Sequence, residues 1–95
     1  MTMQFIKHDL GHRTDGDMVE VSLTAAANVR LLDSSNLRMY RYGQKFKYIG
    51  GYYKHSPVQF EIPRPGHWYV VVDLGGYAGE VGSSIRVLSG EALSG

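Results

Sequence analysis

Residues 57–74, PVQFEIPRPGHWYVVVDL, decide the fold class of this chain. The first part, PVQFEI, alternates apolar and polar residues, which is the period of a strand with one buried face. The last part is apolar at every position from 68 to 72, which is typical of a strand covered on both faces. The intervening PRPGH predicts a type II turn over residues 64–67 that reverses the chain, because proline fixes φ and glycine tolerates a positive φ. The stretch therefore predicts an all-β protein.

The composition limits the remaining possibilities. With 95 residues, the chain is expected to form one domain over residues 1–88, followed by a flexible tail over 89–95. The absence of cysteine excludes disulfides, thiolate metal sites and a cysteine nucleophile. The first twelve residues lack a signal-peptide pattern, and no stretch approaches the ~20 apolar residues of a membrane span. We therefore expect a cytoplasmic protein without a membrane contact.

Short strands are predicted along the rest of the chain, separated by turns about every ten residues. At most one short helix is expected, near 34–42, with a structured loop as the alternative. Ser34, Ser35 or Asn36 can cap this helix, and Gly43 lies just beyond its end. A loop is expected over residues 10–16. Gly50-Gly51 predicts a two-residue hairpin, with a bulge as the alternative. The strands are expected at residues 3–9, 17–23, 28–32, 46–53 and 80–88, in addition to the two described above. About seven strands indicate an antiparallel β-sandwich, jelly-roll-like, or a small barrel, and the doubly covered strand favours the sandwich.

Several short motifs resemble a known bacterial family. They are Asp33-Ser34-Ser35-Asn36, Gly50-Gly51, Ser56-Pro57-Val58 and Gly66-His67-Trp68. In this order, from about residue 3 to 88, they resemble the family catalogued as domain of unknown function 1883. The resemblance implies an all-β domain that occurs alone or beside other modules, among them Toll/interleukin-1-receptor (TIR) domains. It implies no catalytic residues.

The most informative local feature is a basic, tyrosine-rich segment over residues 38–55. It contains five of the ten Lys and Arg residues, five of the seven tyrosines and no acid, so the remaining chain has five basic against nine acidic residues. Cations neutralise phosphates or carboxylates, and aromatic rings stack on bases. The candidate ligand-binding residues are Arg38, Arg41, Tyr42, Lys45, Lys47, Tyr48, Tyr52, Tyr53 and Lys54. A purely structural interpretation stays open, because tyrosine favours strands and lysine protects exposed sheet edges.

Candidate catalytic and metal-binding groups are sparse. His8, Asp9 and His12 are possible metal ligands, but a third ligand is missing unless His55 or His67 folds nearby. Trp68 is expected to anchor the core. No catalytic motif surrounds the serines at 83 and 84, and the glycines near 75–79 lack the lysine and helix of a phosphate loop. We expect neither an enzyme nor a cofactor.

Three functions from different classes remain. The first is a non-enzymatic binding or interaction module for an anionic ligand or a protein partner, with nucleic acid or a nucleotide among the anionic candidates. The second is an oligomerising structural domain whose exposed tyrosines are buried in a homodimer. The third is a small histidine-dependent metal enzyme. The segregated charge favours the first.

Overall fold

The computed structural model of the chain describes residues 5–75 and 79–88. These residues form seven strands and one α-helix, in agreement with the predicted number of strands and the single helix near 34–42. In chain order the elements are β1 (Phe5–Arg13), β2 (Met18–Leu23), β3 (Ala27–Asp33), α1 (Ser34–Arg41), β4 (Ile49–Tyr53), β5 (Val58–Glu61), β6 (Gly66–Asp73) and β7 (Ser83–Leu88). The predicted tail over 89–95 lies outside the described residues.

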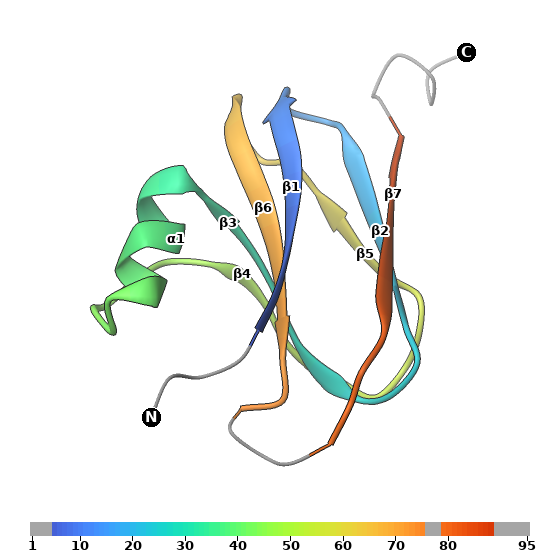
Figure 1. The fold of residues 1–95 in the computed structure, drawn as a ribbon. Helices are drawn as coiled ribbons and strands as arrows, with labels where there is room; N and C mark the ends of the chain where they lie inside the picture. The colour runs from blue at the N-terminus through green and yellow to red at the C-terminus, as the bar shows by residue number, and fades with distance from the viewer. Residues whose placement is uncertain (1–4, 76–78, 89–95) are drawn as a thin grey trace.

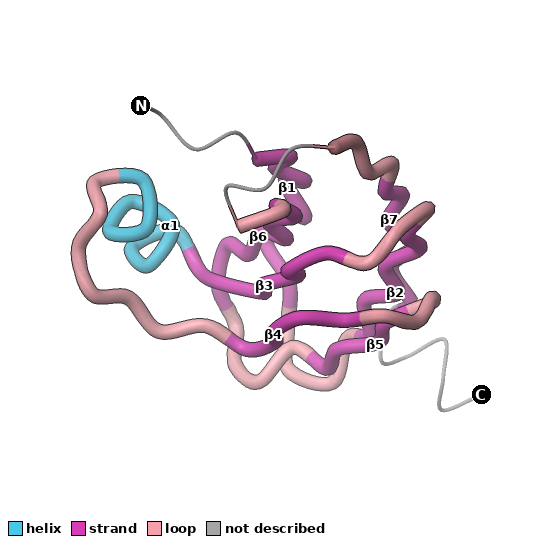
Figure 2. Tube along the Cα trace, turned by 90° about the horizontal axis from the view of Figure 1, so that it is seen from below, coloured by secondary structure: helices cyan, strands magenta, loops and turns pink. Residues whose placement is uncertain are grey.

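The strands form two antiparallel sheets packed face to face, which confirms the predicted β-sandwich (Figure 1). The first sheet has four strands in the order β1-β6-β3-β4, and the second has three in the order β5-β2-β7. Helix α1 lies beside the four-stranded sheet, on the side away from the three-stranded sheet (Figure 2). The four-stranded sheet is therefore the middle layer.

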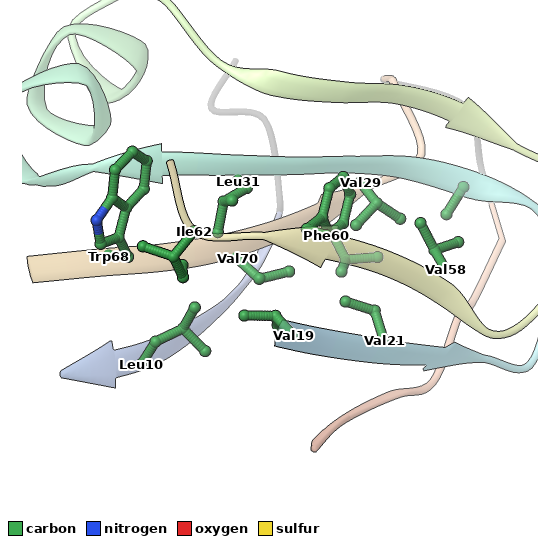
Figure 3. Packing of buried hydrophobic residues seen from close by; sticks show 12 residues of the cluster. Leu10, Val19, Val21, Val29, Leu31, Val58, Phe60, Ile62, Trp68 and Val70 are labelled. Carbon is green, nitrogen blue, oxygen red and sulfur yellow. The ribbon is translucent and has the colours of Figure 1, made fainter. Parts of the chain in front are cut away.

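Strand β6 lies between β1 and β3, as its uninterrupted apolar sequence predicts. Trp68 and Val70 point into the main core between the sheets, together with residues from β2, β3 and β5 (Figure 3). Val72 belongs to the same cluster. Val71 belongs to a second cluster on the other face of the sheet, where it packs with Leu37 of α1. Both faces of β6 are thus buried, so this strand is the centre of the fold.

The chain between β5 and β6 does not form the predicted type II turn. Gly66 has a φ of 159° and is already the first residue of β6. A type II turn needs a φ of about +80° at this position. The PRPGH segment instead carries the chain from the three-stranded sheet to the four-stranded sheet.

Three glycines that were expected to lie in loops, turns or bulges are inside regular strands. β1 continues through Gly11 to Arg13, with a register shift between Asp9 and Gly11, so the predicted loop begins only after Arg13. β4 runs through Gly50-Gly51 in unbroken register with β3, so neither the hairpin nor the bulge forms there. Gly50 has a φ of 131°, and a Cβ at this position would overlap the carbonyl oxygen of Val29. Glycine is used here for a close approach of two strands.

Helix α1 is capped by the residue before the three that the sequence suggested. The Asp33 carboxylate accepts hydrogen bonds from the backbone N–H of Asn36 at 3.0 Å and from its Nδ2 at 2.8 Å, and it pairs with Arg64 at 2.6 Å. Partial burial acts to raise the pKa of Asp33, but these hydrogen bonds outweigh burial and lower it overall. Gly43, with a φ of 70°, follows the C-cap Tyr42 as predicted.

Candidate basic and aromatic surface

The basic residues of the segment are all exposed. They lie on α1, on the loop that follows it and directly after the edge strand β4, which the loop joins to the helix (Figure 2). Three ion pairs occur within the described residues, and they join Arg30 to Asp73, Arg64 to Asp33 and His67 to Asp9. No basic residue of the segment takes part in them. The exposed cations of the segment, which take part in none of these pairs, are Arg38, Arg41, Lys45, Lys47 and Lys54.

The five tyrosines of the segment divide into exposed and buried groups. The exposed fractions are 75% for Tyr42, 45% for Tyr48 and 60% for Tyr52. Tyr40 is buried, with 8% exposed. Tyr53 is half-buried, and its ring packs edge-on against Phe60 at 6.1 Å between centroids. Only the first three rings are therefore well placed to contact a partner.

The nine candidate residues named from the sequence, Tyr53 included, are called the basic Tyr-rich surface below. The structure brings two of its rings onto the outer face of the β3–β4 pair. Tyr52 is opposite Asn28 in register, and Gly50 is opposite Arg30. Tyr48 reaches the same face, since its ring centroid is 5.3 Å from the Arg30 guanidinium. The bare Gly50 therefore lies between two exposed rings along one face of the strand.

A buried polar network lies under this surface, between α1 and the outer face of the four-stranded sheet. Asp73 is its centre, with a side chain that is fully buried. One carboxylate oxygen accepts from Asn28 at 3.0 Å and from the Gly75 N–H at 2.8 Å. The other accepts from Arg30 at 2.5 Å and from the Tyr40 hydroxyl at 2.9 Å. Each Asp73 oxygen thus has two donors, so the carboxylate is satisfied without water.

This network fixes the base of the basic Tyr-rich surface. The Arg30 guanidinium lies 5.8 Å from the Tyr40 ring centroid and 5.3 Å from that of Tyr48. Burial, and then the hydrogen bond to Asp73, raise the pKa of Tyr40, so its hydroxyl stays protonated and continues to donate. The sequence analysis did not identify Asp73 or Arg30. The available signal was a single carboxylate at the end of an otherwise apolar, doubly buried strand, which requires partners.

A family model described as a domain of unknown function (DUF1883) matches residues 3–91. The chain belongs to this family. The match confirms the resemblance found in the sequence motifs. No curated protein and no solved structure matches the chain significantly. Within the described part of the DUF1883 domain, no helix is long and apolar enough to cross a membrane.

The histidines proposed as metal ligands are directed to different places in the DUF1883 domain. His8 Nε2 lies 2.8 Å from the Ser83 hydroxyl, across the gap between β1 and β7. His67 Nε2 lies 2.6 Å from Asp9, and its ring stacks on Tyr69 at 4.8 Å. Over residues 5–75 and 79–88, no three histidine, aspartate or glutamate side chains gather as a metal site. The geometry therefore assigns His8 to an inter-sheet contact and His67 to a surface pair.

The partly buried position of His8 predicts a pH dependence of stability. Burial lowers the pKa of His8, so the folded domain resists the proton that the unfolded chain takes up below its ordinary pKa of about 6.5. The contribution of His8 to stability is therefore complete above this pH and is lost as the pH falls towards the folded pKa. We expect the wild type to lose more stability than His8→Gln between neutral and mildly acidic pH.

Urea denaturation of both proteins at the two pH values measures this difference. Glutamine is the matched control because it retains a polar group towards Ser83 and does not titrate. The other histidines are the same in both proteins, so their contributions cancel. An equal loss of stability in the two proteins would contradict the assignment.

Proposed function

We propose that this DUF1883 domain is a non-enzymatic binding module that recognises an anionic partner through its basic Tyr-rich surface. The observation that carries the proposal is a set of five exposed cations without acidic partners among the described residues, beside three exposed tyrosine rings. We also propose that the module acts in the cytoplasm, which is consistent with a chain without cysteine.

Charge and ring chemistry support this proposal together. Unpaired surface cations attract an anionic partner and accelerate its association. Tyrosine presents a large, rigid ring at low conformational cost and is enriched at interaction hot spots. The surface rests on the four-stranded sheet and on the Asp73 network, so little ordering is needed when a partner binds.

The histidine and serine geometry gives less support to catalysis. His8 and Ser83 are within hydrogen-bond distance, as a base and a nucleophile would be. Among the described residues, however, no acid hydrogen-bonds to the second nitrogen of His8 to orient it. The pair instead connects β1 of one sheet with β7 of the other, which is a structural role.

Fluorescence anisotropy with two labelled anionic probes tests the proposed function. The probes are single-stranded oligothymidine and an acidic peptide rich in glutamate, each titrated at low and at high salt. We expect binding of at least one probe in the range of tens of micromolar, and weaker binding at high salt because the attraction is screened.

The double variant Lys45→Glu/Lys47→Glu is expected to weaken this binding roughly tenfold or more, because two attractive charges become repulsive. The matched control is Lys7→Glu, an exposed charge reversal on β1 at the opposite end of the same sheet. Binding by neither probe, or equal effects of the two variants, would overturn the proposal.

A further inference from the structure

The two sheets have four edges, and the edge of β4 differs from the other three. β1 carries Lys7 and Asp9 and has a register shift, and β5 has only four residues and lies between two prolines. β7 carries Arg86 and is joined to β1 through Ser83. Charges, prolines, bulges and short lengths are the devices that prevent a further strand from pairing.

The five residues of β4, IGGYY, contain no charge and no proline, and β4 pairs with β3 without a register shift. It is the last strand of the four-stranded sheet, and no described strand pairs with its outer edge. Ile49 is 41% exposed and Tyr52 is 60% exposed. Alternate residues of such an edge direct backbone N–H and C=O groups outwards, where an added strand can bind them.

The charges around β4 identify the kind of strand that would fit. Lys45 and Lys47 precede the strand and Lys54 follows it, and all three are exposed. From 47 to 54 an extended chain spans roughly 23 Å. A partner strand with acidic residues towards both ends and uncharged residues between them complements this arrangement.

Two copies of this chain would not complement each other in this way. In an antiparallel pair with Gly50 of each copy opposite Gly51 of the other, Lys47 of each copy lies opposite Lys54 of the other. Like charges directly opposite each other destabilise a strand pair. The charge pattern therefore favours a different, acidic strand over a second copy of β4.

Gly50 of β4 favours a particular side chain at the opposite position of the partner strand. On the outer face of the sheet, Gly50 offers no side chain, while Tyr48 and Tyr52 flank it and are exposed. A large apolar or aromatic residue opposite Gly50 would cover the exposed backbone and contact both rings through the diagonal positions.

We propose that the outer edge of β4 binds an extended acidic peptide as a fifth strand of the four-stranded sheet. An apolar side chain of the peptide covers Gly50, and its acidic residues pair with Lys47 and Lys54. This inference rests on the proposed function and specifies both the partner and the way it binds.

The probe for this inference is a labelled, acetylated and amidated peptide with paired glutamates at both ends and alternating valine, threonine and tyrosine between them. Two isomers carry N-methyl groups on alternate residues, one on the odd positions and one on the even positions. Because a sheet edge pairs with the N–H groups of alternate peptide residues only, one isomer is expected to bind at least tenfold more weakly and the other to bind as the parent does.

Protein variants test the charge pairing. The double variant Lys47→Glu/Lys54→Glu is expected to weaken binding of the parent peptide by at least tenfold, and Lys7→Glu is expected to leave this binding unchanged.

Amide hydrogen exchange gives a second measurement, with slower exchange expected in β4 when the peptide is bound. If both methylated isomers bind as the parent does and the lysine variant still loses binding, strand addition is wrong and the proposed function stands. If oligothymidine binds and the peptide does not, an acidic peptide is the wrong partner and an anionic partner remains. If neither probe binds, both proposals are wrong.

Discussion

Asp73→Ala is expected to lower the free energy of unfolding by roughly 3–5 kcal/mol, the usual cost of removing one partner from a buried ion pair. The substitution removes the shared acceptor of Asn28, Arg30, Tyr40 and the Gly75 N–H. The Arg30 charge would then lie between two tyrosine rings without its carboxylate. Urea denaturation of the two proteins measures the difference.

Two variants show whether the cost belongs to the network. Tyr40→Phe removes one donor and leaves the ion pair, so its expected cost is about 1–2 kcal/mol. Glu61→Ala removes an exposed acid from β5, with an expected change within about 0.5 kcal/mol. If Asp73→Ala costs no more than Tyr40→Phe, the carboxylate is not the centre of the network.

Trp68→Ala is the second substitution with a large expected effect, a loss of roughly 3–5 kcal/mol. The side chain is 2% exposed and packs between the sheets. Its Nε1 donates to the carbonyl oxygen of Arg64 at 3.0 Å, and the Arg64 guanidinium lies 4.9 Å from the ring. Alanine removes this contact and leaves a cavity beside the segment that connects the two sheets.

Matched substitutions separate burial from aromatic character. Tyr42→Ala removes a ring that is 75% exposed, and we expect a change within about 0.5 kcal/mol. Trp68→Phe keeps part of the ring volume and should cost less than Trp68→Ala. Similar losses for Trp68→Ala and Tyr42→Ala in thermal or urea unfolding would show that Trp68 does not anchor the core.

The sequence was sufficient to predict the sandwich and its central strand, because the positions of apolar residues along a strand follow which of its faces are buried. A strand covered on one face alternates, as β5 does, while β6 is apolar on both faces and proved to lie between two neighbours. The pairing partners of β6 could not be predicted, because β1 and β3 are both distant from β6 in the sequence.

The errors in the fold occurred mainly at glycines. Glycine permits a turn, a bulge or a close contact between strands, and the local sequence does not distinguish these uses. Gly50 is required because β3 passes close to it, and that contact comes from a segment about twenty residues earlier in the chain. The continuation of β1 through Gly11 likewise depends on its pairing with β6.

The candidate surface could be located from its charge but not resolved into exposed and buried rings. Tyr40 is on the buried face of α1, and its hydroxyl donates to Asp73, which is distant in sequence. Tyr42 is the C-cap of the helix and is exposed. Leu37 and Tyr40, three residues apart, share one face of the helix, and the structure buries both. The Asp73 network was missed because its members come from three separate parts of the chain, namely β3, α1 and the end of β6.

The order of strands in the two sheets also has a consequence for the speed of folding. β1 pairs with β6, and β2 pairs with β7, so Phe5 meets Asp73 and Met18 meets Leu88. Pairings between such distant segments require large loops to close first, which places folding in the range of about milliseconds to seconds. During synthesis on the ribosome, the three-stranded sheet remains incomplete until Leu88 has emerged. The domain can therefore acquire its final structure only after Leu88 has left the ribosome.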